Sequence, residues 1–202
     1  MGCQDLTHNA LENSSYFGKY RGFVVENEDP EKRARLKVQI PSVTGQAISP
    51  WALPCLPFGG LADQGLLLVP QVGAQIWVEF EEGNPSYPIW TGTFWQRTDD
   101  VPDNASGDDS PTSSLLKTAC GHVLHFQDKS GEEQIKLTHN SGSELLMDEK
   151  GSLAITDSNG GKLVLDAENN SLKFEDTNGN KLTLDSSGTL AEDSNGNKLE
   201  MA

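Results

Sequence analysis

Apolar and polar positions alternate along the C-terminal half of the chain. Leucines recur two residues apart, at Leu163 and Leu165 and again at Leu182 and Leu184, and charged residues flank each pair. A period of two places alternate side chains on the same face of a β-strand. The alternation predicts a series of short strands, each with one apolar face. The positions expected to point inward are Leu163, Leu165, Leu172, Phe174, Leu182, Leu184 and Leu199.

Three near-copies of one phrase, at residues 158–166, 177–185 and 194–201, set the spacing of these strands. Each phrase contains Asn-Gly and follows an Asp, and Asn-Gly readily supplies the positive-φ residues of a tight hairpin turn. The turn glycines are Gly160, Gly179 and Gly196. The repeat of about 18 residues therefore predicts a pair of short strands with a turn at each end.

One such unit buries too few apolar side chains to form a core by itself. Repeats with one narrow apolar stripe must stack along an axis, and the stripe must also be covered from the side. Several identical chains around one axis would do both and would leave no sheet edge unpaired. The alternative is a monomeric β-solenoid, or a meander packed on the N-terminal half.

The N-terminal half has the pattern of a small β-barrel. Strand-like runs occupy residues 20–25, 34–40, 65–70, 75–81 and 88–95, whereas prolines interrupt 51–60, which is expected to be an edge or covering segment. A closed antiparallel barrel of the OB type fits this pattern. We expect an N-terminal arm at 1–15, the barrel at 16–96, an acidic linker at 97–115 and the repeat region at 116–202.

Composition narrows the possible functions. The chain has 202 residues, a formal net charge of -15, and all four Trp in its first half. So negative a charge argues against nucleic-acid binding through phosphate neutralisation. Three cysteines without paired spacing predict no disulfide framework. The sequence has no apolar run of membrane-spanning length and no secretory leader, so we expect synthesis as a soluble cytosolic protein.

The barrel region resembles the OB-fold domain of contractile-tail spike proteins. The resemblance lies in residues 51–57, 69–85 and 87–92, and residues 121–155 resemble the start of the trimeric β-helix of that family. These proteins are the phage central spike and baseplate assembly protein V families and the valine-glycine repeat protein of type VI secretion. The positions that carry the barrel motif are Trp51, Pro54, Val72, Gly73, Trp77, Pro88, Trp90 and Gly92.

The resemblance implies a homotrimer in which an intertwined triple-stranded β-helix, or β-prism, follows the OB-fold. It implies a non-enzymatic spike that joins a tail hub protein to a separate tip protein and pierces the target cell envelope, with transient contact with the target membrane. The expected location is the baseplate of a virion tail made in the host cytoplasm. A phage-derived cellular injector or a type VI-like apparatus is the alternative.

Cys120, His122 and His125 form the best metal-like group. On a strand, His125 points away from the other two, so we expect no metal site within one chain, although one His from each of three chains could meet on an axis. The Asp and Asn residues of the repeats lack the spacing of a calcium loop and are expected to close turns. We therefore expect no metal and no cofactor.

No catalytic motif emerges from the sequence. Glu79 and Glu81 share the polar face of a strand and are expected to face solvent, and the aromatic residues of the barrel have acidic neighbours rather than a basic groove. We expect no catalytic residues and no nucleic-acid partner. Two other classes stay open, a monomeric OB-fold binding module with a β-roll tail and an envelope-degrading enzyme.

Overall fold

The computed structural model of the chain describes residues 15–103 and 111–201. The chain divides after Asp100 into two compact units, and β-strands make up nearly all of the regular secondary structure in both. The prediction of an all-β protein is confirmed. Within the described residues no helix is long and apolar enough to cross a membrane. Apart from Ser15, the predicted N-terminal arm lies outside the described residues.

The first unit is built on a five-stranded sheet with the strand order β2-β1-β4-β5-β3. Its strands are β1 (Tyr20–Glu26), β2 (Lys37–Gln39), β3 (Leu53–Pro54), β4 (Gln75–Phe80) and β5 (Pro88–Thr93). Three short helical turns accompany them, α1 (Pro41–Thr44), η1 (Glu81–Gly83) and η2 (Thr98–Asp100). Strand β3 pairs with β5 in parallel, so the predicted antiparallel barrel is wrong at this one ladder.

A bridge between Leu36 and Ala52 links the two edges of this sheet. Each backbone N–H donates to the other residue's carbonyl, at 3.1 and 2.7 Å, which closes the strands into a barrel around one core. The indole N–H of Trp90 donates to the carbonyl of Ala34 at 3.0 Å inside this core. The buried hydrophobic residues are Val24, Ala34, Leu36, Val38, Ile40, Ala52, Ile76, Val78, Phe80 and Trp90.

An ion pair organises the acidic loop between β1 and β2. The Asp29 carboxylate accepts hydrogen bonds from the Arg35 guanidinium at 2.6 and 3.0 Å and from the backbone N–H groups of Glu31, Arg33 and Arg35. These bonds, that from the Arg35 side chain above all, hold the pKa of Asp29 well below its usual range. The loop is therefore held by its own charged residues.

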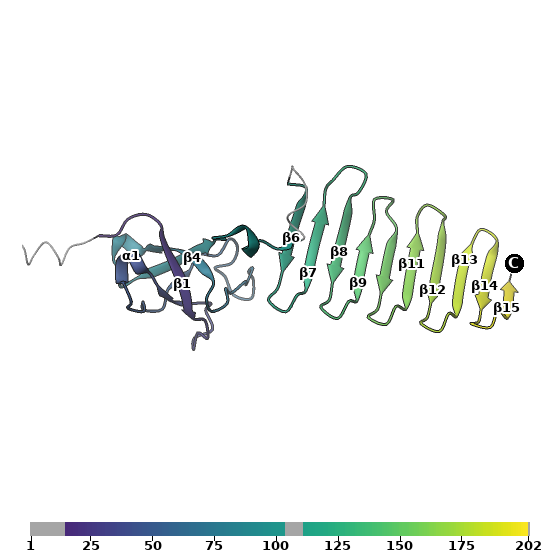
Figure 1. The fold of residues 1–202 in the computed structure, drawn as a ribbon, viewed down its shortest axis with the longest axis horizontal. Coiled ribbons are helices and arrows are strands. Elements are labelled where there is room, and N and C mark those ends of the chain that lie inside the picture. Colours follow the sequence, from purple (N-terminus) through teal and green to yellow (C-terminus); the bar gives the residue numbers. More distant parts are fainter. Residues whose placement is uncertain (1–14, 104–110, 202) are drawn as a thin grey trace, which may run out of the picture. The chain divides into compact units, whose positions relative to one another are not determined.

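The second unit is a ten-stranded antiparallel sheet in which the strands follow one another in sequence order (Figure 1). Each inner strand pairs with the strand before it and the strand after it, β6 and β15 form the two edges, and turns join consecutive strands. The strands are β6 (Ser113–Lys117), β7 (Val123–Gln127), β8 (Gln134–Thr138), β9 (Glu144–Met147), β10 (Leu153–Thr156), β11 (Lys162–Asp166), β12 (Ser171–Glu175), β13 (Lys181–Asp185), β14 (Gly188–Glu192) and β15 (Lys198–Met201).

Two expectations need correction. Residues 65–70 form no strand, because the barrel strands already pair with one another and this apolar run has no ladder partner. The predicted linker at 97–115 is too long, because β6 begins at Ser113, which pairs with Gln127. In one chain the ten strands of the second unit pair with one another in sequence order, and the intertwining of three chains stays a prediction.

Candidate assembly surface

The register of the ten-stranded sheet gathers most of its apolar side chains on one face. Directly opposed residues of antiparallel strands share a face, so the register connects them into rows. One row runs Ser114, Phe126, Ile135, Met147, Leu153, Leu165, Leu172, Leu184, Thr189, Met201. A second row runs Leu116, Leu124, Leu137, Leu145, Ile155, Leu163, Phe174, Leu182, Ala191, Leu199. We call these two rows the apolar face.

Within the second unit, no residue that the structure describes covers the apolar face. Among the described residues of the second unit none is buried, whereas the barrel has a closed core. Leu165 is 47% exposed and Leu199 is 62% exposed. All large hydrophobic residues of this sheet that count as exposed belong to the apolar face. A sheet in this state has no core of its own, so the surface is one that needs a partner.

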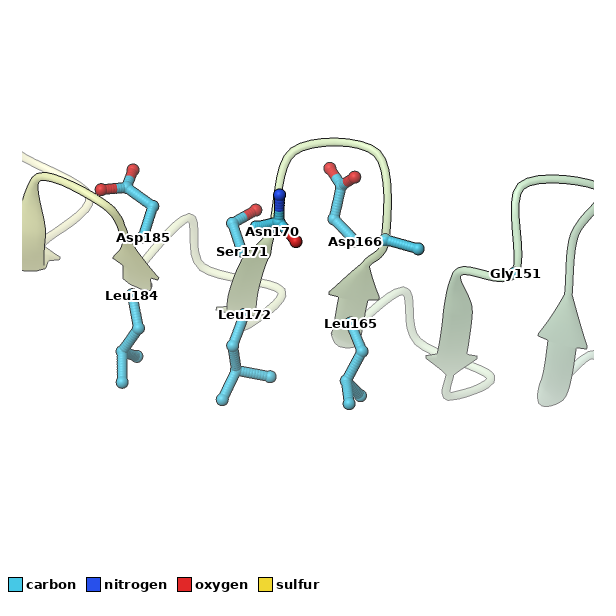
Figure 2. Close-up of a pocket in the computed structure, with 9 residues that line it drawn as sticks. Gly151, Leu165, Asp166, Asn170, Ser171, Leu172, Leu184 and Asp185 are labelled. Carbon is cyan, nitrogen blue, oxygen red and sulfur yellow. The ribbon is translucent and has the colours of Figure 1, made fainter.

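Figure 2 shows three neighbouring strands of this surface. The side chains of Leu165, Leu172 and Leu184 extend to the same side, and those of Asp166 and Asp185 extend away from them. Together these residues line a hollow of about 430 Å³ at the turn that joins β11 to β12. The hollow is open and shallow, which fits a packing surface better than a site for a small molecule.

All seven residues predicted to point inward lie on the apolar face. Leu163, Phe174, Leu182 and Leu199 belong to the second row, and the other three belong to the first. The face also extends back through β6 to β10, which the sequence analysis did not include among the inward positions. The same two-residue spacing, for example Leu124 with Phe126 and Ile135 with Leu137, indicates these further positions.

The opposite face carries a ladder of alternating charges near one end of the strands. The register places Lys162, Glu175, Lys181, Glu192 and Lys198 in one row. Lys181 Nζ lies 3.4 Å from Glu175 Oε1, and Lys198 Nζ lies 3.7 Å from Glu192 Oε2. Exposed pairs of this kind contribute little stability, but they distinguish one register from another.

The hairpin turns at this end repeat one design. In residues 176–180, the Asp176 carboxylate accepts the backbone N–H groups of Asn178 and Asn180 at 2.9 and 2.8 Å. Gly179 follows with a φ of +91° and donates its N–H to the Asp176 carbonyl at 3.2 Å. In turns 157–161 and 193–197, the carboxylates of Asp157 and Asp193 accept the equivalent backbone N–H groups.

The predicted turn glycines are therefore in place, but the turn type differs from the expectation. A two-residue Asn-Gly turn needs positive φ at both residues, whereas only the glycines have it here. The loops have three residues, with a turn followed by a glycine in the left-handed region. The Asp that opens the loop satisfies the backbone N–H groups, which is why Asn need not adopt a positive φ.

Hydrogen bonds to these carboxylates lower their pKa. The side-chain and backbone N–H groups of Asn180 lower the pKa of Asp176 to about 2. Asn169, through its side chain and backbone, and Lys173 lower the pKa of Asp166 to about 2. Both carboxylates are thus ionised over the whole neutral range and remain acceptors for the turns.

Cys120, His122 and His125, which were considered as metal ligands, do not lie together in the structure, and His122 instead contacts His139. His125 lies 3.1 Å from the hydroxyl of Ser113, while the ring of His122 packs at a tilt against that of His139, with 4.5 Å between centroids. Cys120 is an exposed free thiol. Among the described residues no group of three or more His, Cys, Asp or Glu side chains could hold a metal ion. The His139 contact depends on neighbouring turns, which spacing alone does not reveal.

The barrel-motif residues divide between core and surface. Pro88 and Trp90 are buried, Trp51 and Pro54 are half-buried, and Val72 is 60% exposed. Gly73 and Gly92 have φ of +87° and +148°, in the region that favours glycine. Trp77 packs on Phe94 at 4.7 Å, and Glu79 pairs with Lys19 at 3.1 Å. These positions form and close the barrel.

Comparison with known proteins relates the barrel to a described family. Residues 20–95 match the family described as the type VI secretion system/phage-baseplate injector OB domain. The chain is related to the spike proteins of contractile injectors. One such relative, the type VI secretion system spike protein VgrG3 of Vibrio cholerae, is 28% identical over 123 residues, which is 56% of this chain and 12% of that protein.

A second relative extends the comparison with the spike family. The actin cross-linking toxin VgrG1, from another Vibrio cholerae strain, is 28% identical over 114 residues, or 53% of this chain and 10% of that protein. The chain thus spans about a tenth of the length of the curated relatives it matches. The matches relate this chain to spike proteins and say nothing of the other activities of those relatives.

Proposed function

We propose that this chain is the structural central spike of a contractile injection machine, built as a homotrimer. The observation that carries the proposal is the apolar face, which has 18 apolar residues in two rows and no cover from the described residues of its own unit. Burying one Leu side chain contributes about 1.5–3 kcal/mol. Covering the whole face with equivalent faces of other copies would supply the core that the sheet lacks.

Three copies suit the shape of this surface. The apolar face is two side chains wide, so three such faces turned toward one axis would enclose a thin core and form a three-sided prism. The charged ladder and the turns would then lie on the outside or at the corners, in water. The relationship to injector spike proteins supports the role as a spike. Each side of the prism would be the meander of one chain, without exchange of strands.

In this proposal the trimer works mechanically and not as an enzyme. Ten hydrogen-bonded strands per chain, stacked along the axis, form a continuous ladder that resists shear between strands. The OB domain would join a tail hub protein, a separate protein would form the tip, and the prism would carry force to the target envelope with transient membrane contact. The chain would reside in the baseplate of a phage tail or of a phage-derived injector.

Molar mass in solution tests the assembly. Light scattering on the full chain is expected to give three times 21.9 kDa, about 66 kDa. A stable mass of one chain would refute the prism and favour a monomeric binding module, and a mass of two chains would favour a two-sheet sandwich. As a test of the role, injector particles that lack the chain should fail to puncture target cells, and the unaltered chain should restore puncture.

A further inference from the structure

Three asparagines that precede glycine lie in exposed turns of the sheet, Asn159, Asn178 and Asn195. In such a pair, the backbone nitrogen of glycine can attack Cγ of the asparagine side chain, because glycine has no side chain to hinder the approach. A new C–N bond closes a succinimide ring. The side-chain amide nitrogen leaves as ammonia and takes up the proton lost by the glycine. Water then opens the ring to aspartate or isoaspartate.

The attacking nitrogen is occupied in all three turns. Each glycine N–H donates to the carbonyl of the Asp three residues earlier, and this bond closes the turn. The donor–acceptor distances are 3.1 Å for Gly160 to Asp157, 3.2 Å for Gly179 to Asp176 and 3.0 Å for Gly196 to Asp193. The glycine nitrogen must lose this proton and turn toward Cγ of Asn before it can react. Ring closure therefore requires the turn to open.

The Asp carboxylate also holds the asparagine itself. The Asp176 Oδ1 atom accepts the backbone N–H of Asn178 at 2.9 Å, and Oδ2 accepts its side-chain amide at 3.3 Å. The amide that would be lost is thus directed toward Asp176. The same carboxylate accepts the backbone and side-chain N–H groups of Asn180 at 2.8 and 2.6 Å, which fixes the far side of the turn.

We propose that the Asp that opens each of these turns suppresses deamidation of the Asn two residues after it. Loss of the amide would add a negative charge, and isoaspartate would also lengthen the backbone inside a turn that sets the register of two strands. The sheet thus contains three sites of latent chemical modification, each controlled by the carboxylate of its own turn. The inference stands independently of the oligomeric state.

The test compares three equivalent sites within one full-length chain. Parent and Asp176→Ala proteins are incubated in mildly alkaline buffer, and conversion at Asn159, Asn178 and Asn195 is followed by peptide mass spectrometry. Loss of the carboxylate hydrogen bonds is expected to accelerate conversion at Asn178 about tenfold. The other two sites should keep their parent rates. Asp176→Asn keeps a side-chain oxygen as acceptor and should keep Asn178 slow.

Three results would overturn the proposal. Conversion at Asn178 could be equally slow in parent and Asp176→Ala proteins, which would assign the protection to the sheet as a whole. Conversion could rise equally at all three sites, which would mean global opening rather than local control. The folded parent could also convert as fast as the same chain in urea, which would mean that the turns give no protection.

Discussion

Substitution Leu182→Asp tests the apolar face at its most informative position. Leu182 lies in the second apolar row between Phe174 and Ala191. Loss of its burial costs about 1.5–3 kcal/mol per chain, or about 5–9 kcal/mol for three chains, before the cost of burying a carboxylate is added. An effect of this size weakens assembly by at least three orders of magnitude. We expect light scattering to show a smaller species and thermal unfolding to begin earlier.

The neighbouring position provides the matched control. Thr183 lies on the opposite face, between Lys173 and Leu190, so Thr183→Asp adds the same charge where water and a lysine can receive it. This variant should keep the mass and the melting temperature of the parent chain. If the Leu182→Asp protein has the same mass and melting temperature as the Thr183→Asp protein, the apolar face is not an assembly surface.

Three further predictions address turns, pH and the barrel. Gly179→Ala, at a φ of +91°, should cost about 1–2 kcal/mol in chemical unfolding, while Thr177→Ala should cost less. The pKa of Asp176 is about 2, below its usual 3.8, so the ionised carboxylate stabilises the fold fully above pH 3.8 and this stabilisation is lost as the pH falls through 2. The melting temperature of Asp176→Asn should therefore fall less on acidification than that of the parent chain. Asp29→Asn should lower the melting temperature of the barrel, since Arg35 loses its carboxylate partner, and an unchanged melting curve would contradict that assignment.

The apolar face could be predicted from the sequence because it depends on local alternation. Leu163 and Leu165 share a face in any strand, whatever its partner. The identity of that partner depends on which chain supplies the next strand, and alternation is the same for pairing within a chain and between chains. Alternation therefore places these leucines on one face but does not distinguish a meander of one chain from intertwined chains.

The turn type, the strand at 65–70 and the His139 contact were not predicted correctly because residues outside the local sequence pattern decide them. Asn-Gly alone predicts a two-residue turn, but Asp176 accepts the N–H groups that make a three-residue loop favourable. Residues 65–70 read as a strand by composition, yet a strand exists only where a ladder partner is free. His139 reaches His122 because adjacent turns stack, a contact between residues 17 positions apart in the sequence.

Charge and turn chemistry together resolve an ambiguity that the leucines leave open. A shift of β13 by two residues along β12 would still oppose apolar residues, Leu172 to Leu182 or Phe174 to Leu184, because Leu182 and Leu184 are equivalent in the alternation. One such shift would place Lys181 opposite Lys173 rather than opposite Glu175 and would move Gly179 out of the positive-φ position. The opposite shift would place Asn180 at that position. Each alternative loses the glycine that the turn requires, so the repeat specifies its register through its polar residues and its core through its leucines.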